Sequence, residues 1–451
     1  MTLQFGTDGI RGIANAELTP ELMTALGRSA VRVLGADAPF LIGRDTRRSG
    51  SMIQAALVAG LCAEGADVGI LGVLPTPAVA YLARERNAPA LMISASHNSF
   101  EDNGVKIFAS GGKKLSDALQ HQIESELRLL TNSAVALAPT GADIGVDRVV
   151  IGALDDYVKY VVDSFSGRRL DGLRVVLDCG NGAAFLCAPE IFSALGAEVE
   201  VINAVPDGEN INRECGSTDT AALRAAVRDL GADAGLAFDG DADRVIAIDE
   251  FGGVVDGDQM MAICALDLKE QGKLRGNAVV STVMANLGLR RCLEAEDIEL
   301  VEVPVGDRFV LEALEQRNLA LGGEQSGHII FSDLANTGDG ILTGAYILDV
   351  VRATQNSLSV LAGVMQKFPQ VLINVSVRDL QAVMKDSEFM AELQAVELDL
   401  ALNGRALVRL SGTEPVVRVM VEAPSVAQAE LITDRLVAAV LRAGGGPAPT
   451  A

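Results

Sequence analysis

Three aspartates occupy alternate positions in a short polar run, at Asp239, Asp241 and Asp243. The apolar runs 234–238 and 245–248 on either side predict two strands, so the aspartates fall in a tight loop between strands. Alternate side chains of an extended backbone point to one side, and three carboxylates held together repel one another unless a cation binds. Oxygen ligands favour a hard divalent ion, so the run predicts a Mg²⁺ site.

A calcium-binding EF-hand is the alternative for this loop, because Glu250 is the twelfth residue counted from Asp239. Arg244 stands at the sixth position, where an EF-hand needs glycine for its sharp turn, and the flanking runs resemble strands rather than helices. We therefore reject the EF-hand. A solvated acidic turn explains any one of these aspartates, but it is a poor explanation of three with an adjacent arginine.

The composition limits the classes of function. A chain of 451 residues, 49% of them hydrophobic, suggests about three domains with ordinary cores. The net charge of −23 argues against nucleic acid or an anionic membrane as a partner, but local cations still permit a small anionic substrate. Apolar stretches are strand-sized, and we expect no membrane span and no signal peptide. The six cysteines lack C-x-x-C spacing, which favours free thiols in the cytoplasm.

Three stretches of the chain repeat one plan of alternating strands and helices. The expected strands are 40–43, 67–71 and 90–93, then 174–177, 198–202 and 235–238, and finally 278–281, 299–303 and 319–321. The expected helices are 51–64, 188–195, 287–294 and 308–316. This alternation predicts three related α/β domains with mixed, mostly parallel sheets.

A polar, glycine-rich loop follows an apolar strand at a corresponding place in each stretch. The loops are S-A-S-H-N at 94–98, the aspartate loop at 239–244 and G-G-E-Q-S-G-H at 322–328, which ends on His328. Ligands of open α/β sheets bind beyond the carboxyl ends of the strands. We therefore expect the three loops to converge on one site.

The C-terminal stretch has a different pattern. Residues 372–377 and 416–421 alternate as half-buried strands, and 426–442 form an amphipathic helix, which predicts an α+β domain. The expected domains are 1–150, 151–248, 249–360 and 361–443, followed by a flexible tail at 444–451.

Ser96 is a candidate phosphoryl carrier, because it lies beside His97, near Lys106 and opposite the proposed metal loop. A seryl phosphate would add an anionic ligand to the aspartates, and Mg²⁺ would neutralise charge during transfer. Ser94 is the alternative nucleophile, and spacing alone does not separate the two. His121 is expected on a solvated helix face, away from the chemistry.

Three further segments supply groups that bind anions. The turn-rich loop 5–12 contains Arg11 and exposed amides. Residues 306–308 (G-D-R) begin a helix, whose first amides favour an anion. The loop 409–415 (R-L-S-G-T-E-P), together with Arg418, combines guanidinium, hydroxyl and amide donors suited to a phosphate dianion.

These motifs together resemble the α-D-phosphohexomutase family, and most closely its bacterial phosphoglucosamine mutase branch. The matching motifs, in family order, are F-G-T-D-G-I-R-G, S-A-S-H-N, N-G-V-K, D-G-D-A-D-R, V-G-D-R, G-G-E-Q-S-G-H and R-L-S-G-T-E-P. The resemblance implies a heart-shaped enzyme of three related α/β domains and a small phosphate-binding fourth. It also selects Ser96 over Ser94 as the phosphoserine. Ser99 departs from the family, which commonly has proline after His-Asn.

The resemblance further implies roles for individual residues. The expected metal site comprises Ser96 as phosphoserine with Asp239, Asp241 and Asp243 around Mg²⁺. Besides Ser96, the expected catalytic residues are Arg11, Lys106 and His328, for proton transfer or charge stabilisation, and Arg244, which supports the phosphate. The expected substrate-binding residues are Thr7, His97, Asp307, Arg308, Glu324 and Ser326, together with Arg409, Ser411, Gly412, Thr413 and Arg418 around the phosphate that is not transferred.

The implied reaction interconverts glucosamine 6-phosphate and glucosamine 1-phosphate through glucosamine 1,6-bisphosphate, on the route to UDP-N-acetylglucosamine and the cell wall. The alternatives are a phosphomannomutase/phosphoglucomutase, a non-catalytic sugar-phosphate sensor, and a Mg²⁺-dependent phosphatase of another family. Gln325 resembles the glucosamine branch, whereas the mannose/glucose branch usually has Met there. A homodimer remains open, and an unidentified kinase or a bisphosphate is expected to phosphorylate Ser96 first.

Overall fold

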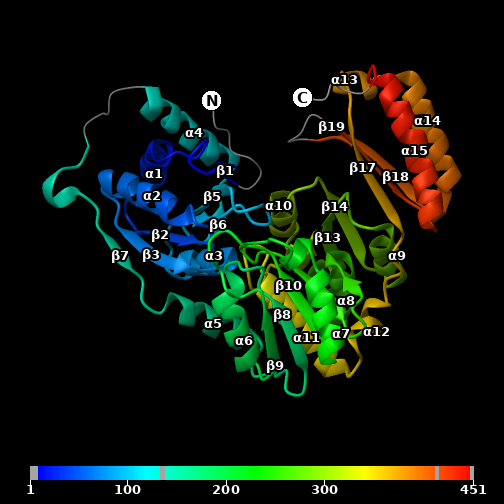
Figure 1. The fold of residues 1–451 in the computed structure, drawn as a ribbon, viewed down its shortest axis with the longest axis horizontal. Helices are drawn as coiled ribbons and strands as arrows, with labels where there is room; N and C mark the ends of the chain where they lie inside the picture. Colours follow the sequence, from blue (N-terminus) through cyan, green and yellow to red (C-terminus); the bar gives the residue numbers. More distant parts are fainter. Residues whose placement is uncertain (1–8, 133–137, 412–415, 447–451) are drawn as a thin grey trace. The chain divides into compact units, whose positions relative to one another are not determined.

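The computed structural model describes residues 9–132, 138–411 and 416–446. The chain divides into two compact units, one of residues 1–284 and 298–364 and the other of residues 285–297 and 365–451. Figure 1 labels the helices and strands of both units. Within the described ranges, no helix combines the length and apolar character needed to cross a bilayer.

The first repeat contains a seven-stranded mixed sheet in the order β1-β5-β4-β2-β3-β7, with β6 beside β5. Its strands are β1 (Ile10–Ile13), β2 (Phe40–Arg44), β3 (Val68–Val73), β4 (Ala90–Ile93), β5 (Asp102–Ala109), β6 (Lys113–Lys114) and β7 (Asp147–Val149). Helices α1 (Pro20–Leu34), α2 (Gly50–Ala63) and α4 (Asp117–Asn132) pack over one face, around a core that includes Ile42. The opposite face, where Gly43 points, is covered by α3 (Thr76–Glu85).

The second and third repeats contain smaller sheets of the same kind. The second has β8 (Arg174–Asp178), β9 (Glu198–Ile202), β10 (Ala234–Phe238), β11 (Val245–Asp249) and β12 (Val254–Val255), in the order β12-β11-β10-β8-β9. The third has β13 (Ala278–Thr282), β14 (Glu299–Val303), β15 (Leu321–Gly323) and β16 (Ile329–Phe331), in the order β14-β13-β15-β16. The helices of this part are α5 (Ala153–Ser164), α6 (Ala184–Ala194), α7 (Ala221–Leu230), α8 (Gly257–Glu270), α10 (Asp307–Arg317), α11 (Gly340–Thr354) and α12 (Leu358–Ala362).

All three repeats share one arrangement of strands, which confirms the predicted α/β class. Each has parallel strands followed by one antiparallel neighbour, and the corresponding pairs are β4–β5, β10–β11 and β15–β16. The serine loop, the aspartate loop and the Glu324 loop connect these three pairs. The chemistry-bearing loops therefore occupy the same topological position in each repeat.

The second unit is an α+β fold, as predicted. Its antiparallel sheet has the order β17-β19-β18, and α14 and α15 lie side by side against it (Figure 1). The elements are β17 (Gln370–Ser376), β18 (Arg405–Leu410), β19 (Val416–Glu422), α9 (Leu287–Ala295), α13 (Leu380–Val383), α14 (Ser387–Leu400) and α15 (Val426–Ala443). Helix α9 groups with this unit rather than with the third repeat. Most of the predicted tail, 447–451, lies outside the described residues.

At some helices, a side chain at the start satisfies the first free amides. Thr19 accepts a hydrogen bond from the Leu22 amide at the start of α1, and Pro20 follows in the first turn. Asp256 and Gln259 form a capping box at the start of α8. Short 3₁₀ turns occur at Gly141–Asp143, Gly216–Thr218, Arg275–Asn277 and Ala401–Asn403.

Expectations about local structure are wrong at segment 5–12, at the start of α6 and at the third strand of the third repeat, which lies at Leu321–Gly323 rather than at 319–321. The segment 5–12 is not entirely a turn-rich loop, because Ile10–Ile13 form β1 and pair with β5, which places Arg11 on a strand. Helix α6 begins at Ala184, one turn before the predicted start at 188. In the first case a partner strand distant in sequence determines the backbone, and local propensity does not include that pairing.

Candidate active site

Ser96 lies in the turn after β4, with its hydroxyl directed at the aspartate loop. Its Oγ donates a hydrogen bond to Asp239 Oδ2 at 2.5 Å, and the residue is 1% exposed. Ser94 Oγ instead donates to Asp45 Oδ2 at 2.7 Å and accepts from the Ser96 amide at 2.9 Å. The geometry therefore separates the two serines, because Ser96 alone of the pair faces the aspartates.

The three aspartates come together at the turn between β10 and β11. One carboxylate oxygen from each lies within 4.8 Å of the others, and all three side chains are buried. The loop is a turn in which Ala242 has φ 53°, so the expectation of alternation along an extended backbone was wrong about how the carboxylates meet. The three carboxylates therefore meet because the backbone turns between β10 and β11.

These residues fit a divalent cation. Asp241 Oδ1 and Asp243 Oδ1 are buried and have no hydrogen-bond partner among the described residues. Buried carboxylate oxygens without partners are costly, and a hard cation satisfies them. The cluster is therefore a candidate metal site.

Lys106 on β5 supplies the nearest positive charge to this cluster. Its ammonium donates to Asp241 Oδ2 at 2.8 Å and to Asp243 Oδ2 at 2.9 Å, and the residue is buried. Burial acts to raise the pKa of Asp243, but Lys106 and the neighbouring His328 more than offset it and hold that pKa well below its usual range. Burial and the charges of Asp243 and Asp241 raise the pKa of Asp239 well above its usual range.

His97 is a neutral hydrogen-bond acceptor. Arg244 Nη1 donates to His97 Nδ1 at 2.9 Å, and Ser96 Oγ lies 3.3 Å from the same nitrogen. Burial and the charges of Arg244 and Arg11 lower the pKa of His97 to about 4. The neutral ring of His97 thus lies beside Ser96 Oγ, and the charges of Arg244 and Arg11 act on that ring.

His328 lies at the other side of the aspartate loop and is 1% exposed. The Gly338 amide donates to His328 Nε2 at 3.0 Å, and Nδ1 lies 3.7 Å from Asp243 Oδ1. Burial acts to lower the pKa of His328, but the nearby Asp243 carboxylate more than offsets it and raises that pKa above the usual value. His121 is exposed on α4 beside Glu124, away from this site as expected.

The third loop brings Glu324 to the start of α10. The Gly306 amide donates to Glu324 Oε1 at 3.2 Å, while Ser326 is exposed. Asp307 accepts a hydrogen bond from Lys114. Arg308 pairs with Asp117 and, at 2.8 Å, with Glu312, so its guanidinium is directed at carboxylates in this structure.

The second unit contains an arginine pair. Arg409 of β18 and Arg418 of β19 are direct cross-strand partners, and like charges in that position are unfavourable without an anion. Burial and Arg418 lower the pKa of Arg409, and its Nε has no hydrogen-bond partner among the described residues. Ser411 follows β18 and donates its amide to Val416 O at 2.9 Å. Thr7, Gly412 and Thr413 lie outside the described residues.

Several side chains of the site were missed by the sequence analysis. Thr76 Oγ1 donates to Asp241 Oδ2 at 2.5 Å, and the Thr76 amide donates to Asp241 O at 2.9 Å. Asp45 and Arg47 lie behind the serine loop. The run G-R-D-T-R at 43–47 follows an expected strand, so the rule already applied to the other strand ends would have found this pair. Thr76 does not follow an expected strand, so the same rule would not have identified it.

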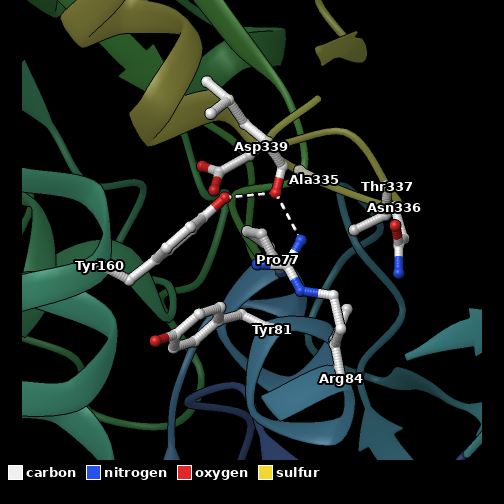
Figure 2. Close-up of a pocket in the computed structure, with 10 residues that line it drawn as sticks. Pro77, Tyr81, Arg84, Tyr160, Ala335, Asn336, Thr337 and Asp339 are labelled. Carbon is white, nitrogen blue, oxygen red and sulfur yellow. Dashed lines mark hydrogen bonds between the residues drawn. The ribbon is translucent and has the colours of Figure 1, made fainter. Parts of the chain in front are cut away.

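The small pocket in Figure 2 is not a substrate site. Its volume is about 10 Å³, which holds at most one water molecule. Arg84 and the Tyr160 hydroxyl both donate to Leu334 O, at 2.7 and 2.5 Å, and the Tyr81 and Tyr160 rings stack 4.1 Å apart. These contacts hold α3 and α5 against the segment that contains Leu334 and Gly338.

Asp339, which also lines this pocket, caps α11, and its contribution to stability depends on pH. Its carboxylate accepts hydrogen bonds from the Tyr157 hydroxyl at 3.0 and 2.9 Å and from the Leu342 amide at 2.9 Å. Burial raises its pKa from 3.8 to about 6. The folded protein therefore holds this proton more tightly than the unfolded chain, and the contribution of Asp339 to stability falls as the pH rises through that window.

We expect Asp339→Asn to remove this dependence. The melting temperature of the variant, relative to the wild type, should increase between about pH 4 and pH 7, by an amount corresponding to at most about 3 kcal/mol. Thermal melts at intervals across this range measure the difference. A difference that stays constant with pH contradicts the prediction.

The chain is similar to known proteins over nearly its whole length. Four domain models match in order, those of phosphoglucomutase/phosphomannomutase α/β/α domains I (residues 2–133), II (155–252) and III (256–368) and the C-terminal domain (372–439). The phosphoglucosamine mutase of Desulforamulus reducens is 51% identical, over 97% of this chain and 98% of the relative. That of Streptomyces griseus is 50% identical, over 98% and 99%.

Solved structures have the same fold. A phosphoglucomutase/phosphomannomutase family protein from Burkholderia thailandensis superposes with a TM-score of 0.82 at 25% identity, over 99% of both chains. Aspergillus fumigatus N-acetylphosphoglucosamine mutase, in complex with GlcNAc-6P and magnesium, has a TM-score of 0.72 at 18% identity, over 98% of this chain and 96% of that one. With the four domain models in order and close relatives over nearly the full length, the chain belongs to the α-D-phosphohexomutase family, in its phosphoglucosamine mutase branch.

Proposed function

We propose that this enzyme interconverts glucosamine 6-phosphate and glucosamine 1-phosphate, with Ser96 as the phosphoryl carrier, on the route to UDP-N-acetylglucosamine. One observation carries the mechanism: the Ser96 hydroxyl lies 2.5 Å from Asp239, at a buried cluster of three carboxylates. The names of the relatives at about half identity support the substrate. A sugar-phosphate sensor would not need a serine at such a cluster.

We assign the aspartate cluster, with the phosphate on Ser96, to Mg²⁺. The oxygen-only donor set and the orphaned oxygens of Asp241 and Asp243 favour a hard ion. Such an ion supplies charge neutralisation for a phosphoryl group. His97, which lies 3.3 Å from Ser96 Oγ, and Arg244, which donates to His97, would orient that group.

The reaction has two matched transfers. In the first, the P–O bond to Ser96 Oγ breaks, a P–O bond forms to the free sugar hydroxyl, and the proton of that hydroxyl passes to the seryl oxygen. The product of this step is glucosamine 1,6-bisphosphate. It reorients in the site and then returns its other phosphate to Ser96. Lys106, His328 and Arg11 are the candidates for moving protons and stabilising charge in these steps.

The substrate contacts follow the same proposal. Glu324 and Ser326 would bind sugar hydroxyls, and Thr7, Asp307 and Arg308 would contribute further contacts. Arg308 must then exchange its carboxylate partners for the substrate. The phosphate that is not transferred would be held by Arg409, Ser411, Gly412, Thr413 and Arg418, where the opposed arginines suit an anion. We also place the enzyme in the cytoplasm and leave its assembly as a homodimer open.

Substrate choice is the direct test. We expect kcat/KM for glucosamine 1-phosphate to exceed the values for glucose 1-phosphate and mannose 1-phosphate by at least about tenfold. Enzyme groups that hydrogen-bond the C2 amine are left without a matching partner when a neutral hexose places a hydroxyl at C2. The assay is phosphosugar isomerisation with a trace of bisphosphate. A preference for either neutral hexose would replace this function by that of a phosphomannomutase/phosphoglucomutase.

Gln325 is the residue to vary in that assay. Its amide offers a donor and an acceptor that methionine lacks. If the side chain helps to orient the loop around C2, Gln325→Met should lower the preference for glucosamine. An unchanged ratio leaves the function in place and shows that Gln325 only packs the loop.

A further inference from the structure

Arg47 is buried beneath the serine loop, with 1% of its surface exposed. Its guanidinium donates to the backbone carbonyls of Ser96 and Asn98 at 2.9 Å each, to that of Asp102 at 3.1 Å, and to that of Ser99. Asp45 Oδ2 accepts from Arg47 Nε at 2.8 Å and keeps the charge paired. One planar cation thus bonds three carbonyls of the turn that carries the nucleophile and a fourth at the first residue of β5.

A second donor reaches the same turn from the second repeat. Asn212 Nδ2 donates to Ser96 O and to Asn98 O, at 2.9 Å each. Both carbonyls therefore accept from one side chain of each repeat. Gly240 of the aspartate loop also approaches here, since a Cβ at that position would lie 2.4 Å from Ser96 O. The backbone of the nucleophile is held against the loop that carries the carboxylates.

The backbone of Ser96 needs such support. Ser96 has φ 53°, in the left-handed region that residues other than glycine rarely adopt. A strained conformation persists at a functional site only where surrounding contacts determine it. The carbonyl of Ser96 itself accepts from Arg47 and Asn212, so these two bonds act directly on the strained residue.

We propose that Arg47 and Asn212 are positioning residues, which hold Ser96 in the orientation required for phosphoryl transfer. The inference rests on the proposed function and extends it to two residues that touch no substrate. In-line transfer depends on the placement of the attacking oxygen, and a displacement of about 1 Å can cost about 100-fold in rate. A lysine at position 47 has no planar fork and cannot satisfy the same carbonyls.

The test compares Arg47→Lys and Asn212→Gly with Arg28→Lys as a matched control. Arg28 forms a partly buried ion pair with Glu64 in the same repeat, and its guanidinium is directed at that carboxylate rather than at the serine loop. Glycine at position 212 removes the amide and tolerates the positive φ of 58° found there. Each protein is mixed with glucose 1,6-bisphosphate, which transfers one phosphate to Ser96 Oγ, while the seryl proton passes to the sugar oxygen. Single-turnover mass spectrometry measures this rate, and amide exchange of the 94–103 peptide measures loop order.

We expect the transfer rate to fall about 100-fold in Arg47→Lys and about tenfold in Asn212→Gly, with kcat reduced and KM for glucosamine 1-phosphate nearly unchanged. Both variants should lose amide protection in the 94–103 peptide, and Arg28→Lys should match the wild type in both readouts. Wild-type transfer rates in both variants, or an equal loss in Arg28→Lys, overturn the inference. If Arg47→Lys does not fold, Asn212→Gly decides alone.

Failure of the proposed function has a different signature. Wild-type protein that takes up no phosphate at Ser96 overturns the phosphoserine mechanism. Amide exchange then decides by itself whether Arg47 and Asn212 order the loop, because that readout needs no substrate.

Discussion

Replacing Ser96 by alanine should lower the mutase rate by about 10⁴-fold or more, because the reaction loses the atom that carries the phosphate. The fold should survive, since the hydroxyl makes its bond to Asp239 in a loop outside the hydrophobic cores. The coupled assay measures the rate, and intact-mass analysis should find a phosphate on the wild type that maps to the Ser96 peptide. The variant should carry none there.

Ser94→Ala is the control for this substitution. Ser94 bonds Asp45 and the Ser96 amide, so its loss should reduce loop order and rate without preventing phosphorylation. Full activity in Ser96→Ala, or a phosphate that maps to Ser94 instead, would remove Ser96 from the mechanism.

The second large effect is expected for Asp241→Asn. The change removes one negative charge from the cluster and leaves Asp243 as the remaining anionic partner of Lys106 there. Apparent Mg²⁺ affinity should fall by at least about 100-fold, since even residues that only orient metal ligands contribute 10- to 100-fold. The rate at a low Mg²⁺ concentration should fall in proportion and recover partly at high Mg²⁺. Activity titrated against Mg²⁺ measures the shift.

Asp178→Asn provides a matched control from the same repeat. Asp178 is also buried, but it accepts from the Gly180 and Gly216 amides rather than joining the cluster. This variant should lose stability while its Mg²⁺ dependence stays that of the wild type. Activity that is indifferent to chelators would show that the three carboxylates are not a metal site.

Much of the architecture was predictable, because hydrophobic periodicity and glycine-rich strand ends are local signals. Strands β4, β9 and β14 begin and end at the predicted residues. Helix α14 and strand β18 of the second unit were not predicted. In these two segments the apolar positions contact a core that exists only after folding, as with Phe389 and Val408.

The sequence by itself determined the chemical inventory of this protein: which loops carry serine, carboxylates and cations, and that each follows a strand. Only the tertiary structure decided which of these groups meet. It separated Ser96 from Ser94 by the partner of each hydroxyl, and it joined Asp239 to Ser96 across a sequence separation of 143 positions. It also set Arg47 beneath the serine loop. The physical reason is that residue type and spacing describe one strand end at a time, whereas the distances between strand ends depend on how three separate sheets pack.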